Sequence, residues 1–176
     1  RARRERKEEL IVATMRVLGD IEARADASGA FEAAHDQGYQ NVLDVDPQTG
    51  ETTYRPEMIP RAGVELDFCP NFGGVRNWYS SAYHPKTRAL YIPIHPTCVR
   101  GTFTELEQMV GNNYYANRGW QGRGSRVHPN SEGYPGHLIA MDIDTGEIKW
   151  RHSSETRALS AALTTAGGFV VSGNGD

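Results

Sequence analysis

The chain has 176 residues, of which 38% are hydrophobic, and a formal net charge of -3, so its composition is that of a globular protein with one or two domains. No apolar run approaches the ~18–20 residues of a membrane-spanning helix, so no span is expected. Glutamates dilute the arginines of residues 1–9, which argues against a nucleic-acid-binding arm. Because the chain opens on Arg1 and stops within turn-forming residues, we expect both ends to be cut from a longer protein.

A turn motif recurs along the chain and predicts its strands. Residues 26–29, 46–50 and 144–146 each begin with aspartate and end with glycine, and residues 84–88 form a degenerate fourth copy. In such hairpin turns the carboxylate accepts hydrogen bonds from backbone N–H groups, and the glycine adopts the left-handed conformation. Strand-like residues flank the copies, the third being followed by a strand that ends in Trp150. The repeat predicts an all-β fold, either a propeller or a repeating sandwich.

Residues 69–78 read Cys-Pro-Asn-Phe-Gly-Gly-Val-Arg-Asn-Trp and form the candidate site. Gly73 and Gly74 allow a positive φ or a close approach of the backbone to another group. Asn77 offers two amide donors and a carbonyl acceptor, and Trp78 offers a flat aromatic face. Together they suit a planar ligand that carries carbonyl oxygens. The alternative is a glycine loop before a strand, with Asn77 capping the loop and Trp78 in the core.

The segments that follow are open to more than one interpretation. Cys69 and Cys98 flank a strand-rich segment and are either two separate buried thiols or a disulfide formed in an oxidising compartment. Residues 99–135 interrupt the repeat and predict a long rim loop, which covers a binding face or is a surface meander, with a short helix at residues 104–110. The six histidines lack metal-ligand spacing, so no metal ligand is expected. Residues 163–173 predict a hairpin with its turn at Gly167 and Gly168.

Three segments resemble pyrroloquinoline quinone (PQQ)-dependent alcohol dehydrogenases. They are Leu-Thr-Thr-Ala-Gly-Gly at residues 163–168, the Ala-x-Asp-x-x-Thr-Gly repeat followed by Trp within residues 137–150, and residues 69–93 with their glycine pair and Asn77. The resemblance extends over nearly the whole chain. It implies that residues 1–176 are one partial domain of an eight-bladed β-propeller, with about three to four antiparallel blades. It also implies a periplasmic oxidoreductase that passes a hydride from an alcohol to PQQ and electrons to a cytochrome c.

The resemblance also assigns roles to individual residues. Asn77 falls where the family has an asparagine that bonds to PQQ carbonyl oxygens, and Arg16 falls near its cation beside the quinone. With Trp78, these are the expected cofactor-binding residues, and the Asn77 amide and Arg16 are expected to share a cavity on the propeller axis. Cys69 and Cys98 match a pair that is disulfide-bonded in family members. Trp150 is expected to be buried between blades.

Two departures limit the expectation. The family's catalytic base and its ligands for Ca²⁺ or a lanthanide ion lie upstream of the matched residues, so this chain alone is expected to be inactive and to contain no catalytic residue. A tryptophan that often contacts the cofactor is replaced within the stretch Ser160, Ala161 and Ala162. The alternative is therefore a cofactor-free propeller that acts as a scaffold for protein assembly.

Overall fold

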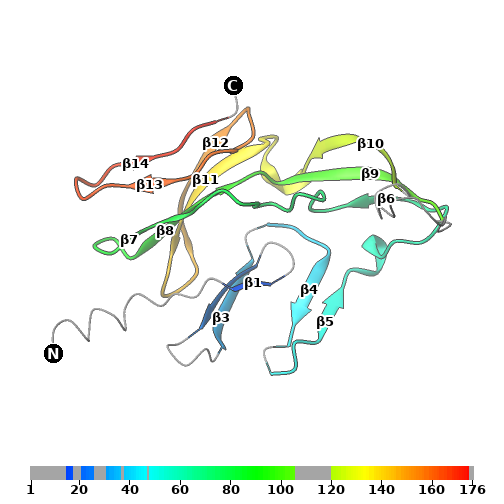
Figure 1. Cartoon of the computed structure of the whole chain (residues 1–176), viewed down its shortest axis with the longest axis horizontal. Coiled ribbons are helices and arrows are strands. Elements are labelled where there is room, and N and C mark those ends of the chain that lie inside the picture. The colour runs from blue at the N-terminus through cyan, green and yellow to red at the C-terminus, as the bar shows by residue number, and fades with distance from the viewer. Residues whose placement is uncertain are drawn as a thin grey trace, which may run out of the picture.

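The protein is all-β with antiparallel sheets, as expected (Figure 1). The computed structural model describes residues 15–17, 21–25, 31–36, 38–46, 48–105 and 120–174. Described strands form five sheets, which are β1 (Met15–Val17), β2 (Ile21–Ala25) and β3 (Phe31–Asp36); β4 (Val42–Val45) and β5 (Thr52–Tyr54); β6 (Glu65–Phe68), β9 (Thr97–Phe103) and β10 (Trp120–Val127); β7 (Ala82–His84), β8 (Ala89–Ile94), β11 (Gly136–Asp142) and β12 (Ile148–Ser154); and β13 (Leu163–Thr164) with β14 (Val170–Val171). Two 3₁₀ turns, η1 (Pro56–Met58) and η3 (Pro129–Ser131), connect strands.

The four-stranded sheet, in the order β12-β11-β8-β7, holds the core. Every residue of β8 is buried, because successive side chains point to opposite faces and both faces are covered. On one face Ile92 and Ile139 pack with Val75, which comes from the candidate-site segment. On the other face Tyr91 and Ala140 pack with residues that include Ala162 and, at the edge, Val170 of β14. The candidate-site segment is thus attached to the core through Val75.

The hairpin β13–β14 lies beside β7, as the next sheet of a propeller would. Thr164 Oγ1 donates to the Tyr83 carbonyl at 3.2 Å, and the Ala162 N–H donates to the Ser80 carbonyl at 2.9 Å. β12 is the opposite edge strand of this sheet. Trp150 on β12 is 42% exposed, with its ring centroid 5.6 Å from that of Tyr91, so the expectation that it is buried is wrong.

The recurring turn is built with the same hydrogen bonds in two copies. Asp46 Oδ1 accepts from the N–H groups of Gln48 and Thr49 at 2.7 and 3.0 Å, and Gly50 has φ 75°. In the third copy the carboxylate belongs to Asp142, whose Oδ1 accepts from the backbone N–H groups two and three residues later, at 2.8 and 3.2 Å.

The expected start of that copy at Asp144 is therefore two residues late. Asp144 instead forms a two-pronged ion pair with Arg88, both contacts being 2.5 Å. Arg88 ends the degenerate turn with φ 48°, in the position that glycine has in the other copies. The hairpin at Gly168, with φ 85°, agrees with its prediction.

The predicted rim loop at residues 99–135 is partly β-structure. β9 and β10 pair antiparallel along most of their length, with a register shift between Gly122 and Ser125 where Gly124 has φ 79°. The sequence hid this ladder because β10 is rich in glycine and arginine and lacks alternating apolar residues, so its pairing rests on backbone hydrogen bonds.

Two other expectations fall outside the described residues, namely the turn at 26–29 and most of the helix at 104–110. In the part of the chain that is described, no helix is long and apolar enough to cross a membrane.

Replacing Gly136 by alanine is expected to destabilise the protein by about 1–3 kcal/mol. A Cβ at Gly136 would lie 2.1 Å from the Thr156 carbonyl oxygen and 2.7 Å from the Ala158 nitrogen, and both are backbone atoms that cannot rotate away. Urea denaturation of Gly136→Ala measures the effect. Gly167→Ala is the matched control, because its Cβ would meet only ordinary contacts at 3.6 Å or more, and its stability should change by less than about 0.5 kcal/mol.

Asp142 is expected to make the protein more stable above pH 4 than at pH 2. A hydrogen bond from Lys149, helped by backbone N–H groups, lowers the pKa of Asp142 from 3.8 to about 2. Its stabilisation is therefore present above the unfolded value and is lost as the pH falls through about 2. Thermal melts of Asp142→Asn should show a smaller loss of melting temperature between pH 4 and pH 2 than the parent chain. Asp44→Asn on β4 is the control, and an identical acid slope in the parent and Asp142→Asn would contradict this role.

Candidate cofactor-binding site

Residues 69–77 form a loop that is fastened to the connection between β8 and β9. The Asn71 N–H donates to the Thr97 carbonyl at 2.7 Å, and the Asn71 side-chain amide donates to Thr97 Oγ1. The His95 N–H donates to the Val75 carbonyl at 2.7 Å. These bonds join the loop to β9 at one end and to the end of β8 at the other, so its backbone has a defined path.

The loop also organises itself around Asn71. Asn71 Oδ1 accepts from the Gly73 N–H at 2.7 Å, and the Asn71 carbonyl accepts from the Gly74 N–H at 2.8 Å. Gly74 has φ 76°, a conformation that other residues rarely adopt. The predicted need for glycine at this position is therefore confirmed.

A disulfide between Cys69 and Cys98 closes the loop onto β9. The two Cα atoms are 4.5 Å apart, and both side chains are buried with Met58 and Tyr39 around them. Of the two interpretations that the sequence left open, the structure therefore has the disulfide. No other cysteine exists in the chain.

Asn77 lies at the end of this loop, half-buried, with its amide close to Gly73 and His95. A Cβ built on Gly73 would lie 3.7 Å from Asn77 Nδ2 and 3.9 Å from His95 Nε2, so the missing side chain of Gly73 leaves room for both groups. Within the described residues, no hydrogen bond ties the Asn77 side chain to the protein. The alternative in which Asn77 caps the loop is thus not what the structure shows.

The other two predicted cofactor residues are placed only in part. Trp78 is 79% exposed and lies 6.0 Å from the Tyr79 ring, so it is not a core residue and its flat face is accessible. Arg16 lies in β1 and pairs with Glu22 of β2, but its side chain is outside the described residues. The cavity that Arg16 and Asn77 are expected to share therefore stays a prediction.

His95 is a residue of this site that the sequence analysis did not select. It is 5% exposed, lies edge-on to the Tyr79 ring at 6.1 Å, and its Nδ1 atom has no hydrogen-bond partner in the described part of the chain. Burial, together with the Arg157 guanidinium, lowers the pKa of His95, so the imidazole is neutral at pH 7. Its position between a proline and the end of β8 gave no sequence signal of its own.

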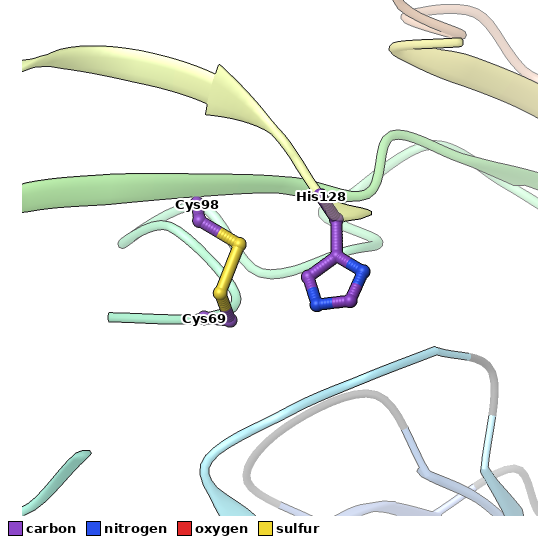
Figure 2. Close-up of side chains that lie close together, drawn as sticks. All are labelled: Cys69, Cys98 and His128. Carbon is purple, nitrogen blue, oxygen red and sulfur yellow. A yellow bond between two sulfur atoms is a disulfide. The ribbon is translucent and has the colours of Figure 1, made fainter. Parts of the chain in front are cut away.

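A cavity of about 580 Å³ lies at the disulfide and is separate from Asn77 and Trp78. Its apolar walls include Tyr39, Met58 and the disulfide, and Figure 2 shows the imidazole of His128 beside the sulfur atoms. The tilted rings of Tyr39 and His128 are 4.6 Å apart between centroids.

The same group could be taken for a metal centre. A ring nitrogen of His128 and the two sulfur atoms all lie within 4.8 Å of one another. Sulfur atoms bonded to each other are not thiolates, however, and a thiolate is the form of cysteine that binds Zn²⁺. In this oxidised state the three residues are therefore not a metal-ligand set.

The rim of the cavity carries an ion-pair cluster. Arg100 donates to both oxygens of Asp67, at 3.0 and 2.6 Å, and Arg126 also donates to Asp67. The hydrogen bond from Arg100 is the main cause of a lowered pKa of Asp67, so this carboxylate is charged at neutral pH.

Sequence comparison relates the chain to quinoprotein dehydrogenases. It is 29% identical over 127 residues to the quinoprotein ethanol dehydrogenase of Pseudomonas putida, a match that covers 72% of this chain and 19% of that protein. It is 30% identical over 146 residues to the lanthanide-dependent methanol dehydrogenase of Methylorubrum extorquens, covering 73% of this chain and 22% of that protein. A lupanine 17-hydroxylase [cytochrome c] of a Pseudomonas species is 27% identical over 93% of this chain. No family model matches.

Comparison of structures gives the same fold. A europium-containing methanol dehydrogenase matches with a TM-score of 0.69 and 22% identity, covering 86% of this chain and 26% of that one. The chain therefore has the fold of part of a quinoprotein dehydrogenase propeller. It spans about a fifth to a quarter of the length of the relatives that it matches.

Removal of the disulfide is expected to lower the stability of the chain by about 3–4 kcal/mol, because a loop of this length is then open in the unfolded state. Replacing both Cys69 and Cys98 by alanine avoids a free thiol, and urea denaturation gives the difference. Mass mapping of the parent chain without reductant should recover the two cysteine peptides as one linked species. Recovery of two alkylated cysteine peptides, or an unchanged midpoint in the double variant, would contradict the structural role.

Proposed function

This chain is a distant homologue of PQQ-dependent alcohol and methanol dehydrogenases, and we propose that it supplies part of the cofactor wall of such an enzyme. The observation that carries the proposal is the Asn77 amide. It stands on a loop that is fastened by a disulfide and by bonds to Thr97, yet it has no hydrogen bond of its own within the described residues. A polar group that is held in place but makes no hydrogen bond within the protein is suited to bind a ligand.

The residues present fit one side of a planar quinone. The Asn77 amide would donate to a carbonyl oxygen of PQQ, and the exposed Trp78 ring offers a flat surface beside it. The cation of Arg16 would stabilise negative charge on the reduced quinone. The missing side chain of Gly73 keeps the approach to Asn77 open.

The chemistry follows from the cofactor. Bound PQQ supplies a quinone that accepts a hydride from an alcohol-type substrate. The base and the ligands of Ca²⁺ or a lanthanide ion are proposed to lie outside this chain, in the remainder of an eight-bladed, periplasmic propeller of which these residues form three to four blades. A cytochrome c is the proposed electron acceptor, which agrees with the name of the lupanine hydroxylase relative. What this chain contributes is the position of its donor groups.

One observation favours the alternative, a cofactor-free scaffold. Ser160 stands in the stretch where the family often has a tryptophan, and its hydroxyl is engaged in the fold. Ser160 Oγ donates to the Gly173 carbonyl at 2.8 Å and accepts from the Gly173 N–H at 2.5 Å. This position thus holds the β13–β14 hairpin rather than offering an aromatic face.

Asn77→Ala, made in the full-length protein that contains these residues, is expected to weaken PQQ binding about tenfold, because one hydrogen bond to a quinone carbonyl oxygen is lost. The apoprotein is reconstituted with PQQ and either Ca²⁺ or La³⁺, and both PQQ retention and alcohol-dependent dye reduction are measured. The control is Asn174→Ala, a change at an exposed residue, which should leave both values unchanged.

The outcomes separate the two functions. Unchanged PQQ affinity in Asn77→Ala removes Asn77 from the site. A parent protein that retains no PQQ with either metal ion supports the scaffold instead.

A further inference from the structure

Three residues with metal-ligating atoms line the cavity at the disulfide. Cys69, Cys98 and His128 are each at most 5% exposed, and a ring nitrogen of His128 and the two sulfur atoms all lie within 4.8 Å of one another (Figure 2). Two cysteines and one histidine are a donor set that binds Zn²⁺ in proteins, with water at the fourth position. Only the bond between the sulfur atoms keeps this set from binding a metal ion, because the ligand form of cysteine is the thiolate.

Reduction of the disulfide supplies the two missing ligands. A dithiol that reduces this bond is itself oxidised to a disulfide, so two electrons and two protons pass to the sulfur atoms of Cys69 and Cys98. Zn²⁺ then replaces the two thiol protons, which are released to solvent. Both cysteines line a cavity of about 580 Å³, which is large enough to admit a small dithiol to the buried bond.

The spacing of the three ligand atoms suits a metal ion after small side-chain movements. In a tetrahedral site with Zn–S near 2.3 Å and Zn–N near 2.0 Å, neighbouring ligand atoms are roughly 3.5–3.8 Å apart. Once the sulfur atoms are no longer bonded, rotation about the Cα–Cβ bonds moves them apart, while the two Cα atoms can stay 4.5 Å apart. The ring nitrogen starts within 4.8 Å of both sulfur atoms, so it has to approach them by only about 1 Å.

His128 is a neutral imidazole at pH 7. Burial, together with the Arg55 guanidinium, lowers the pKa of His128, so the ring keeps a lone pair for a metal ion. Its Nδ1 accepts from the Asn130 N–H at 2.9 Å, so Nε2 is the candidate ligand atom. Ligation through Nε2 moves the ring proton to Nδ1, and the Asn130 N–H then needs another acceptor. Asn130 is exposed, so water can take that place.

We propose that the reduced chain binds one Zn²⁺ ion between the thiolates of Cys69 and Cys98 and the imidazole of His128, with water from the cavity as the fourth ligand. The disulfide excludes the ion from the oxidised chain. Neither Asn77 nor Trp78 lines this cavity, so the site does not depend on the proposed PQQ wall.

The test uses Co²⁺ as a spectroscopic substitute for Zn²⁺. The 176-residue chain is reduced with a phosphine, which gives two electrons to the disulfide and becomes a phosphine oxide, and it is then titrated with Co²⁺. One equivalent should produce the near-ultraviolet thiolate-to-Co²⁺ bands and the visible bands of tetrahedral coordination, and Zn²⁺ should abolish both. The oxidised chain should produce neither. In ¹H–¹⁵N spectra of the reduced chain, Zn²⁺ should shift the Asn130 amide.

A reduced chain that shows no thiolate bands overturns the proposal. Thiolate bands without tetrahedral coordination, or a Zn²⁺-insensitive Asn130 amide, also contradict it. If reduction unfolds the chain, Zn²⁺ should restore the native spectrum, because an ion that binds only the folded state stabilises that state. A chain that stays unfolded with Zn²⁺ therefore counts against the site as well.

Variants of the reduced chain test the third ligand. His128→Phe keeps a ring against Tyr39 but removes the ligand nitrogen, whereas His128→Asn keeps an acceptor for the Asn130 N–H. Either one that folds should weaken Co²⁺ binding at least tenfold, since changes to the groups around a metal ligand already cost about 10–100-fold. His152→Phe, at an exposed position of β12, is the matched control and should bind Co²⁺ as the parent does. Parental affinity in the His128 variants removes His128 from the site and refutes it.

Discussion

The covalent bond between Cys69 and Cys98 is the constraint on which the candidate site depends. It joins the start of the loop at residues 69–77 to β9, and Thr97, the neighbour of Cys98, binds the Asn71 backbone and side chain. Two residues, His95 and Pro96, separate β8 from β9, so this short connection belongs at once to the core sheet and to the sheet of β6, β9 and β10 (Figure 1). A displacement of the loop would therefore have to move two sheets. This explains how a segment without regular secondary structure can hold an amide in a fixed position.

The hydrophobic core also holds the loop at residues 69–77 in place. Val75 is buried against Ile92 and Ile139, and its carbonyl accepts from His95, so one residue ties the loop both to the hydrophobic core and to the backbone of the β8–β9 connection. A second contact links the core sheet to a neighbour. At Gly146 the turn between β11 and β12 lies so close to the His35 ring that an added Cβ would be 2.1 Å from it. The turn at Gly146 is therefore a packing element between sheets as well as a reversal of the chain, whereas an added Cβ at Gly50 would meet nothing within 4 Å.

The sequence predicted what depends on local chemistry and failed where the outcome depends on which sheet covers which face. The turns at Gly50 and Gly168 were predictable because turn-forming residues determine a hairpin locally, an aspartate and a glycine in the first and a glycine pair in the second. The positive φ of Gly74 followed from the same kind of reasoning. Trp150 was mispredicted because burial of an edge strand depends on a distant hairpin, and β10 was missed because its pairing rests on backbone groups. His95 and His128 carried no local signal, since only tertiary packing buries them and determines which ring nitrogen is free.

The two asparagines of the loop show how the fold separates support from recognition. Asn71 has its N–H, its carbonyl and both ends of its amide engaged within the protein, so it can offer nothing to a ligand. Asn77 stands six residues later on the backbone that Asn71 organises, and none of its amide groups is engaged within the described residues. A fully buried amide without a partner would cost about 1–3 kcal/mol. Because Asn77 is only half-buried, water can hydrogen-bond to its amide, so the loop can fold without a ligand in place.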